Sequence, residues 1–479
     1  MNLKKFGLTA LFAVLGTSAF GASIDHIQNY TAEYNANMAQ QAAISPTTSA
    51  YYNPAGIMRL ENGTYFTGGV QLAIGKETMK YHTKDGDGGD YSADLLAPIP
   101  NFAMIKKQDD RAFFWTFGGI AGGGDLKYED GVAGIKVLED SLAGFRNPGL
   151  PGFSKEKYPL LGISNLNTSG SWAEGENMYA QTTIGTAWNI NNKLSMSVAG
   201  RVVYGWRNLK AGLTAEGYAT PIGNNGPAMN GSSPVSIPVT GTASIDSERT
   251  AWGFGGQIGL NYAANDTWNF AMRYDTKIKL EFEADADSQE LIINNVIKPG
   301  LGFEDFFPQY ADGVKHRRDL PALLALGASQ KVTDRWTMFY GFNYYFNESA
   351  KIDKDVKYTK LGTDEVKYTG LEYDNGWEIS VGTEYWLNEK WAVLAGVNYA
   401  DTGAPKDSYS DVEFALNSFL VGMGVKYRPD EDTEWVVSTS HYFYESADGN
   451  FKEKYDGLAN AQRYDKNISS IGFSYTKKF

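Results

Sequence analysis

Histidine and serine are the residues whose types could support catalysis, because imidazole can act as a base and a hydroxyl as a nucleophile. The four histidines are scattered and form no His-Glu-x-x-His zinc motif. Ser438, Ser440 and His441 lie close in sequence, but nothing in their spacing specifies hydrogen-bond reach between nucleophile and base. Cysteine is absent, which excludes thiolate metal sites and disulfides. The sequence therefore predicts no catalytic site, no metal and no cofactor.

Three arginines could bind an anion, since a guanidinium pairs bidentately with a carboxylate. They are Arg201, Arg249 and Arg273, and each lies where polar and apolar residues alternate. On a strand, such alternation places the arginines on one face and apolar residues of the same strands on the other. The apolar residues that mark the outward face are Val202, Phe254 and Met272. Two roles stay open for the arginines: contact with a carboxylate ligand, or ion pairs with Glu378 or Glu384.

A second candidate for ligand contact is an apolar cluster in the predicted loop between residues 284 and 317. Its members are Leu291, Ile292, Ile293, Val296, Ile297, Leu301, Phe303, Phe306, Phe307 and Tyr310. This apolar density is unusual for a loop that faces solvent. The residues either pack among themselves as a cap, or they also line a surface groove that captures an apolar ligand.

The elements that must position these residues are strands with a period of two. Between Arg335 and Asn347 the alternate residues are large and apolar or aromatic: Trp336, Met338, Tyr340, Phe342, Tyr344 and Phe346. Six such residues on one face, ending in aromatics, suit a strand that faces lipid. The same alternation begins at Trp268, Trp377, Trp391 and Phe419. The apolar face of any one of these strands would also suit the core of a soluble sandwich.

The connections decide between these alternatives. Short polar turns alternate with long segments, which is the layout of bacterial outer-membrane barrels. The predicted turns are 108–110, 189–192, 264–267, 333–335, 388–390 and 429–433, and the predicted long loops are 76–97, 122–175, 208–239, 284–317, 348–374, 401–414 and 446–466. Counting the alternating segments gives 14 strands. The predicted fold is thus an all-β, 14-stranded antiparallel transmembrane β-barrel.

The N-terminus and the composition agree with export to an outer membrane. Residues 1–21 have the order of a secretory signal, with Lys4 and Lys5 before an apolar stretch and small residues at the end. No later segment offers the roughly 20 consecutive apolar residues of a membrane helix. The net charge of −13 argues against nucleic-acid binding. The chain ends on Phe479, an aromatic residue that resembles the assembly signal of such barrels.

Residues 22–60 precede the first strand and do not alternate, and they contain Asn53, Pro54 and Ala55. Together with Asp319-Leu320-Pro321, Asp401-Thr402-Gly403 and the strand count, this motif resembles the FadL family of outer-membrane transporters, in which an N-terminal plug carries an Asn-Pro-Ala signature. The resemblance implies that residues 22–60 form a plug inside a barrel of residues 61–479. Without the resemblance, Pro54 could be an ordinary turn proline.

Glycines gather at the end of the third predicted strand, at positions Gly118, Gly119, Gly122, Gly123 and Gly124. Clustered glycines weaken a ladder and permit a bend or bulge. The resemblance implies an inward kink here, which opens the wall for lateral exit of an apolar ligand. The alternative is an ordinary glycine-rich loop.

The resemblance also implies the function. We expect a monomeric transporter that takes up long-chain fatty acids or other hydrophobic compounds, captures them at extracellular loops and releases them into outer-membrane lipid. The alternative is a surface-exposed adhesin or another partner-binding outer-membrane protein. The sequence does not distinguish a fatty acid from another lipophile.

Overall fold

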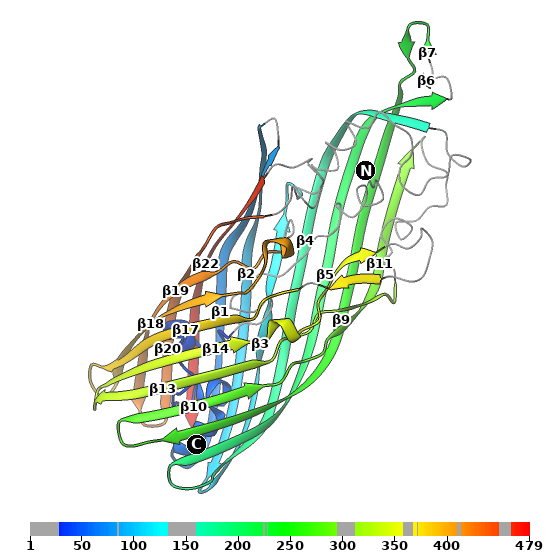
Figure 1. Cartoon of the computed structure of the whole chain (residues 1–479). Coiled ribbons are helices and arrows are strands. Elements are labelled where there is room, and N and C mark those ends of the chain that lie inside the picture. The colour runs from blue at the N-terminus through cyan, green and yellow to red at the C-terminus, as the bar shows by residue number, and fades with distance from the viewer. Residues whose placement is uncertain are drawn as a thin grey trace.

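The structure is a computed structural model that describes residues 28–83, 86–132, 160–223, 226–227, 229–294, 312–357, 367–370, 372–409, 413–449 and 461–479. In these ranges, strands wind into a closed barrel, and long strands extend beyond its upper rim on one side (Figure 1). In the same ranges, no helix has the length and apolar character needed to span a membrane.

The barrel has 14 strands in the described ranges, each antiparallel to the next, and the last pairs with the first. The predicted strand number is confirmed. In order, they are β1 (Gly63–Thr83), β2 (Gly86–Gln108), β3 (Arg111–Tyr128), β4 (Leu160–Asn189), β5 (Leu194–Gly223), β9 (Ile237–Ala263), β10 (Trp268–Asp275), β13 (Leu323–Thr333), β14 (Trp336–Tyr345), β17 (Gly376–Trp386), β18 (Trp391–Asp401), β19 (Ser418–Asp430), β20 (Thr433–Tyr444) and β22 (Ala461–Lys478).

The structure also contains shorter helices and strands. Residues 28–60 form α1 (Ala32–Ala36), α2 (Ser49–Tyr52) and the 3₁₀ helix η2 (Pro54–Arg59). On the side of the long connections lie β6 (Gly226–Pro227), β7 (Met229–Asn230), β8 (Ser233–Pro234), β11 (Glu281–Asn294), β12 (Lys315–Arg317), η5 (Asn347–Ser349), β15 (Asp353–Lys357), β16 (Lys367–Gly370), η6 (Lys406–Ser408) and β21 (Ala447–Asp448).

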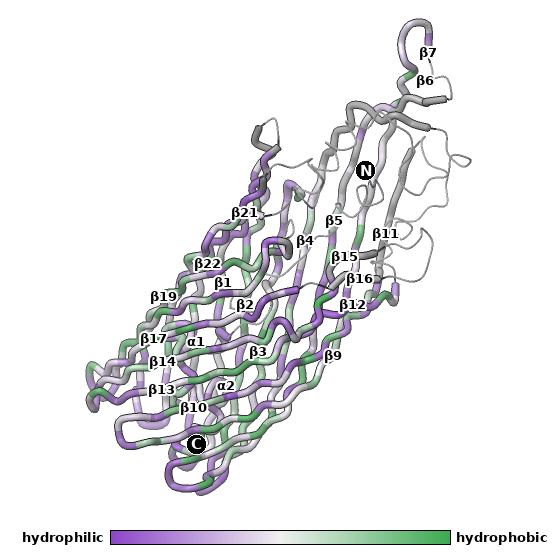
Figure 2. The backbone as a smooth tube through the Cα atoms, in the orientation of Figure 1, coloured by the Kyte–Doolittle hydropathy of each residue, from purple (hydrophilic) through white to green (hydrophobic). Residues whose placement is uncertain are grey.

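The predicted lipid-facing residues lie on the outer surface. On β14, Trp336 and Tyr340 are exposed while their neighbours Gly341 and Asn343 are buried. On β18, Trp391, Val393 and Val397 are exposed in the same alternation. Apolar residues alternate with polar ones along the wall, as the hydropathy colouring of Figure 2 shows. Since an exposed apolar band is stable only in lipid, this surface fits a transmembrane barrel.

The short turns were predicted correctly, but several predicted loops are strand. In segment 76–97, for example, residues 76–83 and 86–97 are paired strands, in which Lys76 pairs with Asp94 and Glu77 with Ala93. Strands β4 and β5 each have 30 residues. At about 3.3 Å per residue such a strand spans roughly 100 Å, several times the height of the apolar band of a barrel. Above the membrane these strands carry no apolar face, so their sequence predicts a loop although the ladder continues.

Candidate functional site

Residues 28–60, here called the lumenal segment, lie inside the barrel and are almost entirely buried. Thr31 is the N-cap of helix α1, and its side chain accepts a hydrogen bond from the Tyr34 backbone. The Ala32 backbone donates to Ser474 Oγ on β22 at 3.2 Å. The interior of the barrel is thus occupied by the chain's own N-terminal residues.

Glycines on the inner wall make room for this segment. Five successive strands each contribute one glycine that contacts residues 35–42, and we call this set the glycine belt: Gly327, Gly341, Gly382, Gly396 and Gly422. A Cβ added at Gly327 would lie 2.6 Å from the Ala42 backbone nitrogen, and one at Gly396 would lie 2.8 Å from Asn37 Cα. Any larger residue in the belt would therefore collide with the lumenal segment.

Asn53, Pro54 and Ala55 fasten the end of the lumenal segment to β5 and β9. The Asn53 side chain caps η2 by accepting from the Gly56 backbone at 3.1 Å and donates to Asn261 Oδ1 at 2.8 Å. Pro54 occupies the first turn of η2, where a missing N–H has no cost. The Ala55 carbonyl accepts from Ser195 Oγ at 2.7 Å. In this structure the motif is a structural joint.

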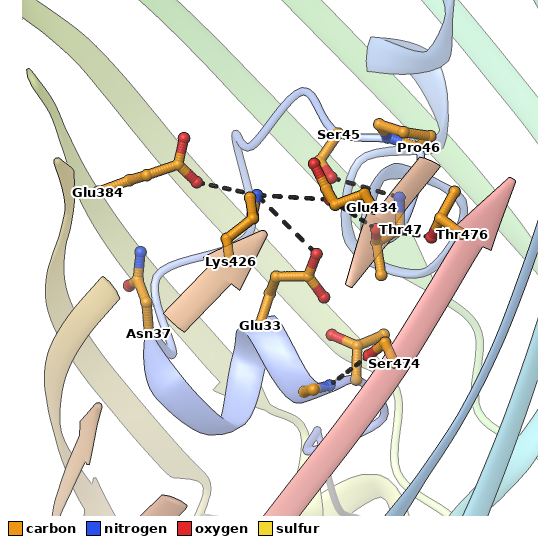
Figure 3. Close-up of polar contacts among 12 residues, drawn as sticks. Glu33, Asn37, Ser45, Pro46, Thr47, Glu384, Lys426, Glu434, Ser474 and Thr476 are labelled. Atoms are coloured by element: carbon orange, nitrogen blue, oxygen red, sulfur yellow. Dashed lines mark hydrogen bonds and ion pairs between the residues drawn. The ribbon is translucent and has the colours of Figure 1, made fainter. Parts of the chain in front are cut away.

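A buried ion cluster holds α1 against β17, β19 and β20 (Figure 3). Lys426 Nζ lies 2.9 Å from Glu384 Oε2, 3.6 Å from Glu434 Oε1 and 3.9 Å from Glu33 Oε1. Thr47 of the lumenal segment donates to Glu434. Burial raises the pKa of Glu33 in α1 above its usual range, while nearby Lys426 opposes the rise.

A cavity of ≈ 590 Å³ at the rim of the short turns reaches Glu434.

Two of the three predicted arginines lie together. Arg273 pairs with Asp275 at 3.3 Å between Nε and Oδ2 and donates to Gln28 Oε1 at 3.0 Å. Arg201 donates to Gln181 Oε1 at 3.0 Å and to the carbonyl of Thr276, the residue after Asp275.

The third arginine stands apart from these two. Arg249 lies opposite Arg207 in the β5–β9 ladder, whereas Arg201 lies opposite Gly255. Six residues of strand correspond to roughly 20 Å. Of the two acidic residues considered as ion-pair partners, Glu384 pairs with Lys426, and Glu378 accepts from Asn343 at 2.9 Å. Alternation predicts the face of each arginine but not its height along the barrel, so the sequence did not indicate this separation.

A small cavity lies between the lumenal segment and the wall beside Arg273. Its volume is ≈ 10 Å³, enough for about one water molecule. It is lined by residues of both parts: Tyr30, Ala50, Tyr51, Thr116, Gly118, Ile120, Gln181, Thr183, Gln257, Arg273 and Asp275. A ligand larger than water requires this cavity to widen.

The glycine cluster lies in β3, where the ladder is irregular on both sides. Towards β4, register shifts occur between Gly119 and Ala121 and between Gly122 and Gly124. Gly122 and Gly124 have φ values of 104° and 74°, which favour glycine. Towards β2, pairing stops at Asn101 with Gly118 and resumes at Leu96 with Asp125. Residues 97–100 and 119–124 are thus left without cross-strand partners between β2 and β3, and we call them the unpaired stretch.

Sequence reasoning missed two contributors to this stretch. Pro98 and Pro100 lie on the β2 side, and proline has no N–H to donate to a ladder. Two prolines within a strand pattern indicate an interrupted ladder, so the sequence did contain this signal. The other contributor is Tyr51, whose hydroxyl contacts both strands. No local pattern indicates that contact.

The remaining predicted site residues have different outcomes. Leu291, Ile292 and Ile293 are not in a loop, because β11 pairs them with Thr242 and its neighbours on β9. Val296, Ile297, Phe303, Phe306 and Phe307 lie outside the described residues, as does the predicted signal, residues 1–21. Gly123 lies within β3.

Ser440 and His441, two of the three residues considered for catalysis, face opposite sides of β20. Ser440 Oγ donates to Asn35 Oδ1 in the lumen, and the His441 ring packs on Phe443, an exposed residue. Ser440 is therefore not beside the His441 ring, whose Nδ1 instead lies 2.8 Å from Ser469 Oγ on β22.

Known proteins resemble this chain in sequence and in fold. The long-chain fatty acid transport protein of Escherichia coli K12 is 22% identical over 350 residues, which are 71% of this chain and 70% of that protein. A Pseudomonas aeruginosa FadL homologue has a TM-score of 0.61 at 13% identity, with 97% of this chain and 100% of that one covered. The Ralstonia pickettii toluene transporter TbuX has a TM-score of 0.55 at 16% identity, with 95% and 100% covered.

The sequence profile of one family covers most of the barrel wall. It is that of the outer membrane protein transport protein family (OMPP1/FadL/TodX), and it matches residues 174–479. These residues run from within β4 to the end of the chain. The chain therefore belongs to this family of outer-membrane transport proteins, whose members carry hydrophobic compounds and are not enzymes.

Proposed function

We propose that this transporter takes up amphiphiles with a carboxylate head group, long-chain fatty acids above all, and releases them sideways through the unpaired stretch between β2 and β3. The observation that carries the proposal is the position of this stretch, which borders the cavity beside Arg273. We infer that the lumenal segment closes the direct route through the barrel, so that the wall is the nearest exit for a ligand in the cavity. In this proposal the lumenal segment acts as a gate.

Lateral release has a physical reason. A fatty acid that left through the rim would expose its chain to water again, at a cost of roughly 0.8 kcal/mol per CH₂ group. Passage through the wall keeps the chain in apolar surroundings. The exposed side chain of Leu96 on β2 lies at the outer edge of the unpaired stretch. This apolar edge favours direct transfer into lipid.

Arg201 is the reason to expect a carboxylate. It is 2% exposed, and in the part of the chain that the structure describes it has no carboxylate within ion-pair distance. Arg273, in contrast, already pairs with Asp275. A buried charge without a counter-ion is costly, so a ligand carboxylate that reached Arg201 would be bound favourably. A neutral hydrocarbon gains nothing from this charge.

A reversible cross-link tests the exit route. A Cβ at Gly119 would lie 3.4 Å from Ile99 Cγ2. Because Cγ2 lies one bond beyond Cβ, as a cysteine sulfur would, the two side chains meet at the short range that a disulfide needs. The chain has no cysteine of its own, so Ile99→Cys with Gly119→Cys gives one defined pair across the unpaired stretch. Oxidation should abolish uptake of radiolabelled oleate by host cells, and reduction should restore it.

The control places the same cross-link in a regular part of the wall. Val381 and Val397 are direct partners on β17 and β18, so Val381→Cys with Val397→Cys should leave uptake unchanged in either redox state. Full uptake by the oxidised pair at residues 99 and 119, with normal surface expression, would exclude lateral exit at this place.

The head group is tested with Arg201→Met and two probes that share a chain, oleate and oleyl alcohol. Loss of a charge-assisted interaction should weaken oleate binding by roughly 10- to 100-fold and leave oleyl alcohol binding unchanged. Arg249→Met, distant along the same face, is the matched control. Equal weakening of both probes would mean that Arg201 supports the wall and does not select the ligand.

A further inference from the structure

The Tyr51 hydroxyl joins the lumenal segment to both strands that flank the unpaired stretch. It lies 2.6 Å from the Phe102 carbonyl on β2 and 3.0 Å from the Phe117 carbonyl on β3. Phe102 and Phe117 are cross-strand partners, and pairing stops one residue pair beyond them. A phenol has one proton to donate, so this single group contacts the two strands where their ladder ends.

The backbone of Tyr51 is held from another part of the barrel. Arg273 Nη1 on β10 donates to the Tyr51 carbonyl. Helix α2 is therefore fixed at one residue to β10 through its carbonyl and to β2 and β3 through its side chain. Tyr51, Arg273 and Gly118 also line the same cavity, so a ligand that widened the cavity would contact all three.

We propose that Tyr51 is the positioning residue through which ligand in the cavity controls separation of β2 and β3. The proposal rests on the proposed function, because it assigns the control of that same exit. When the carboxylate pairs with Arg201, the ligand widens the cavity that Tyr51 and Arg273 line and separates the Tyr51 carbonyl from the Arg273 guanidinium. Helix α2 then loses its hold on β10, the hydroxyl leaves the two carbonyls, and the strands separate along a stretch that has no ladder of its own.

A neighbouring tyrosine provides the matched control. The Tyr52 hydroxyl donates to the Gln28 carbonyl at 2.6 Å and accepts from the Tyr30 backbone at 2.9 Å. Both partners belong to the lumenal segment. Tyr51→Phe and Tyr52→Phe thus each remove one buried hydroxyl from α2, but only Tyr51→Phe removes a contact with the wall.

Hydrogen exchange of the full chain in detergent micelles, with and without oleate, tests the proposal. In the parent protein oleate should accelerate exchange at residues 97–103 and 117–124. In Tyr51→Phe the same amides should exchange roughly 5-fold faster without oleate, the change expected when one ordinary hydrogen bond is lost, and oleate should add little. Tyr52→Phe should retain the oleate response of the parent.

Two results would overturn the assignment: parent-like exchange in Tyr51→Phe, or an equal loss of the oleate response in Tyr52→Phe. The disulfide between residues 99 and 119 separates this failure from failure of the proposed function. If oxidation stops uptake but Tyr51→Phe behaves like the parent, the exit is correct and its control lies elsewhere. If oxidation has no effect on uptake, the exit itself is refuted.

Discussion

The wall from β13 to β19 and the wall from β2 to β4 enclose the same lumenal segment in different ways. From β14 to β19 the cross-strand pairing is continuous, without a register shift as far as Tyr427. Between β2, β3 and β4 the ladder shifts repeatedly, and residues 97–100 of β2 have no partners on β3. The first wall is a continuous surface, whereas the second contains a place where strands can part.

The contacts of the lumenal segment follow this difference. The regular wall fits against residues 35–42 through the glycine belt and binds α1 through the Lys426 cluster. The strands beside the unpaired stretch are held by the Tyr51 hydroxyl. A gate needs one fixed side and one side that releases, because movement of the whole segment would open the barrel to water. Three substitutions test this division, from the largest expected effect to the smallest.

Lys426→Met should remove the anchor of the fixed side. It leaves Glu33, Glu384 and Glu434 close together without their shared cation, and breaking a buried ion pair in this way costs about 3–5 kcal/mol. We expect a lower free energy of unfolding in lipid vesicles and leakage of small hydrophilic solutes in a liposome-swelling assay. Lys331→Met, which removes an exposed partner of Asp334, should change neither. A tight, equally stable Lys426→Met barrel would contradict the anchoring role.

Gly382→Val should displace the lumenal segment from the glycine belt. The added side chain would overlap Asn37, and overpacking of this kind costs about 1–3 kcal/mol. The measurement is again solute leakage together with unfolding in vesicles. Gly200→Val on β5 is the control, since an added Cβ there meets nothing within 4 Å. Leakage that is the same for both variants would mean that the belt does not position the segment.

Glu33→Gln should have the smallest effect, and the effect should depend on pH. Burial raises the pKa of Glu33 in the folded state, so the folded state binds more protons than the unfolded one. Stability then falls as pH rises from the ordinary glutamate range, about 4, through the raised pKa. Glutamine carries no charge, so Glu33→Gln should be more stable than the parent at pH 9 and similar at pH 4. A parallel pH dependence of the two proteins would show that Glu33 is not the group responsible.

The sequence alone was sufficient to predict the barrel fold. Trp336 and Tyr340 face lipid because a strand turns alternate residues to opposite sides, and this is a property of neighbours in the chain. The short turns were also found at their observed places, since turn residues act locally. Alternation did not predict the strands in segment 76–97, because a strand above the membrane has no apolar face to mark it.

The contacts that make a transport route depend on residues hundreds of positions apart. Gly382 is small because Asn37 lies against it, and Arg201 and Arg273 lie together because β5 and β10 both flank β9. Closure of β22 on β1 brings Ser474 to α1, and register alone places Tyr51 where the β2–β3 ladder ends. A period of two fixes the face of each residue. The height of that residue, and what it meets across the lumen, follow only from the register of the closed barrel.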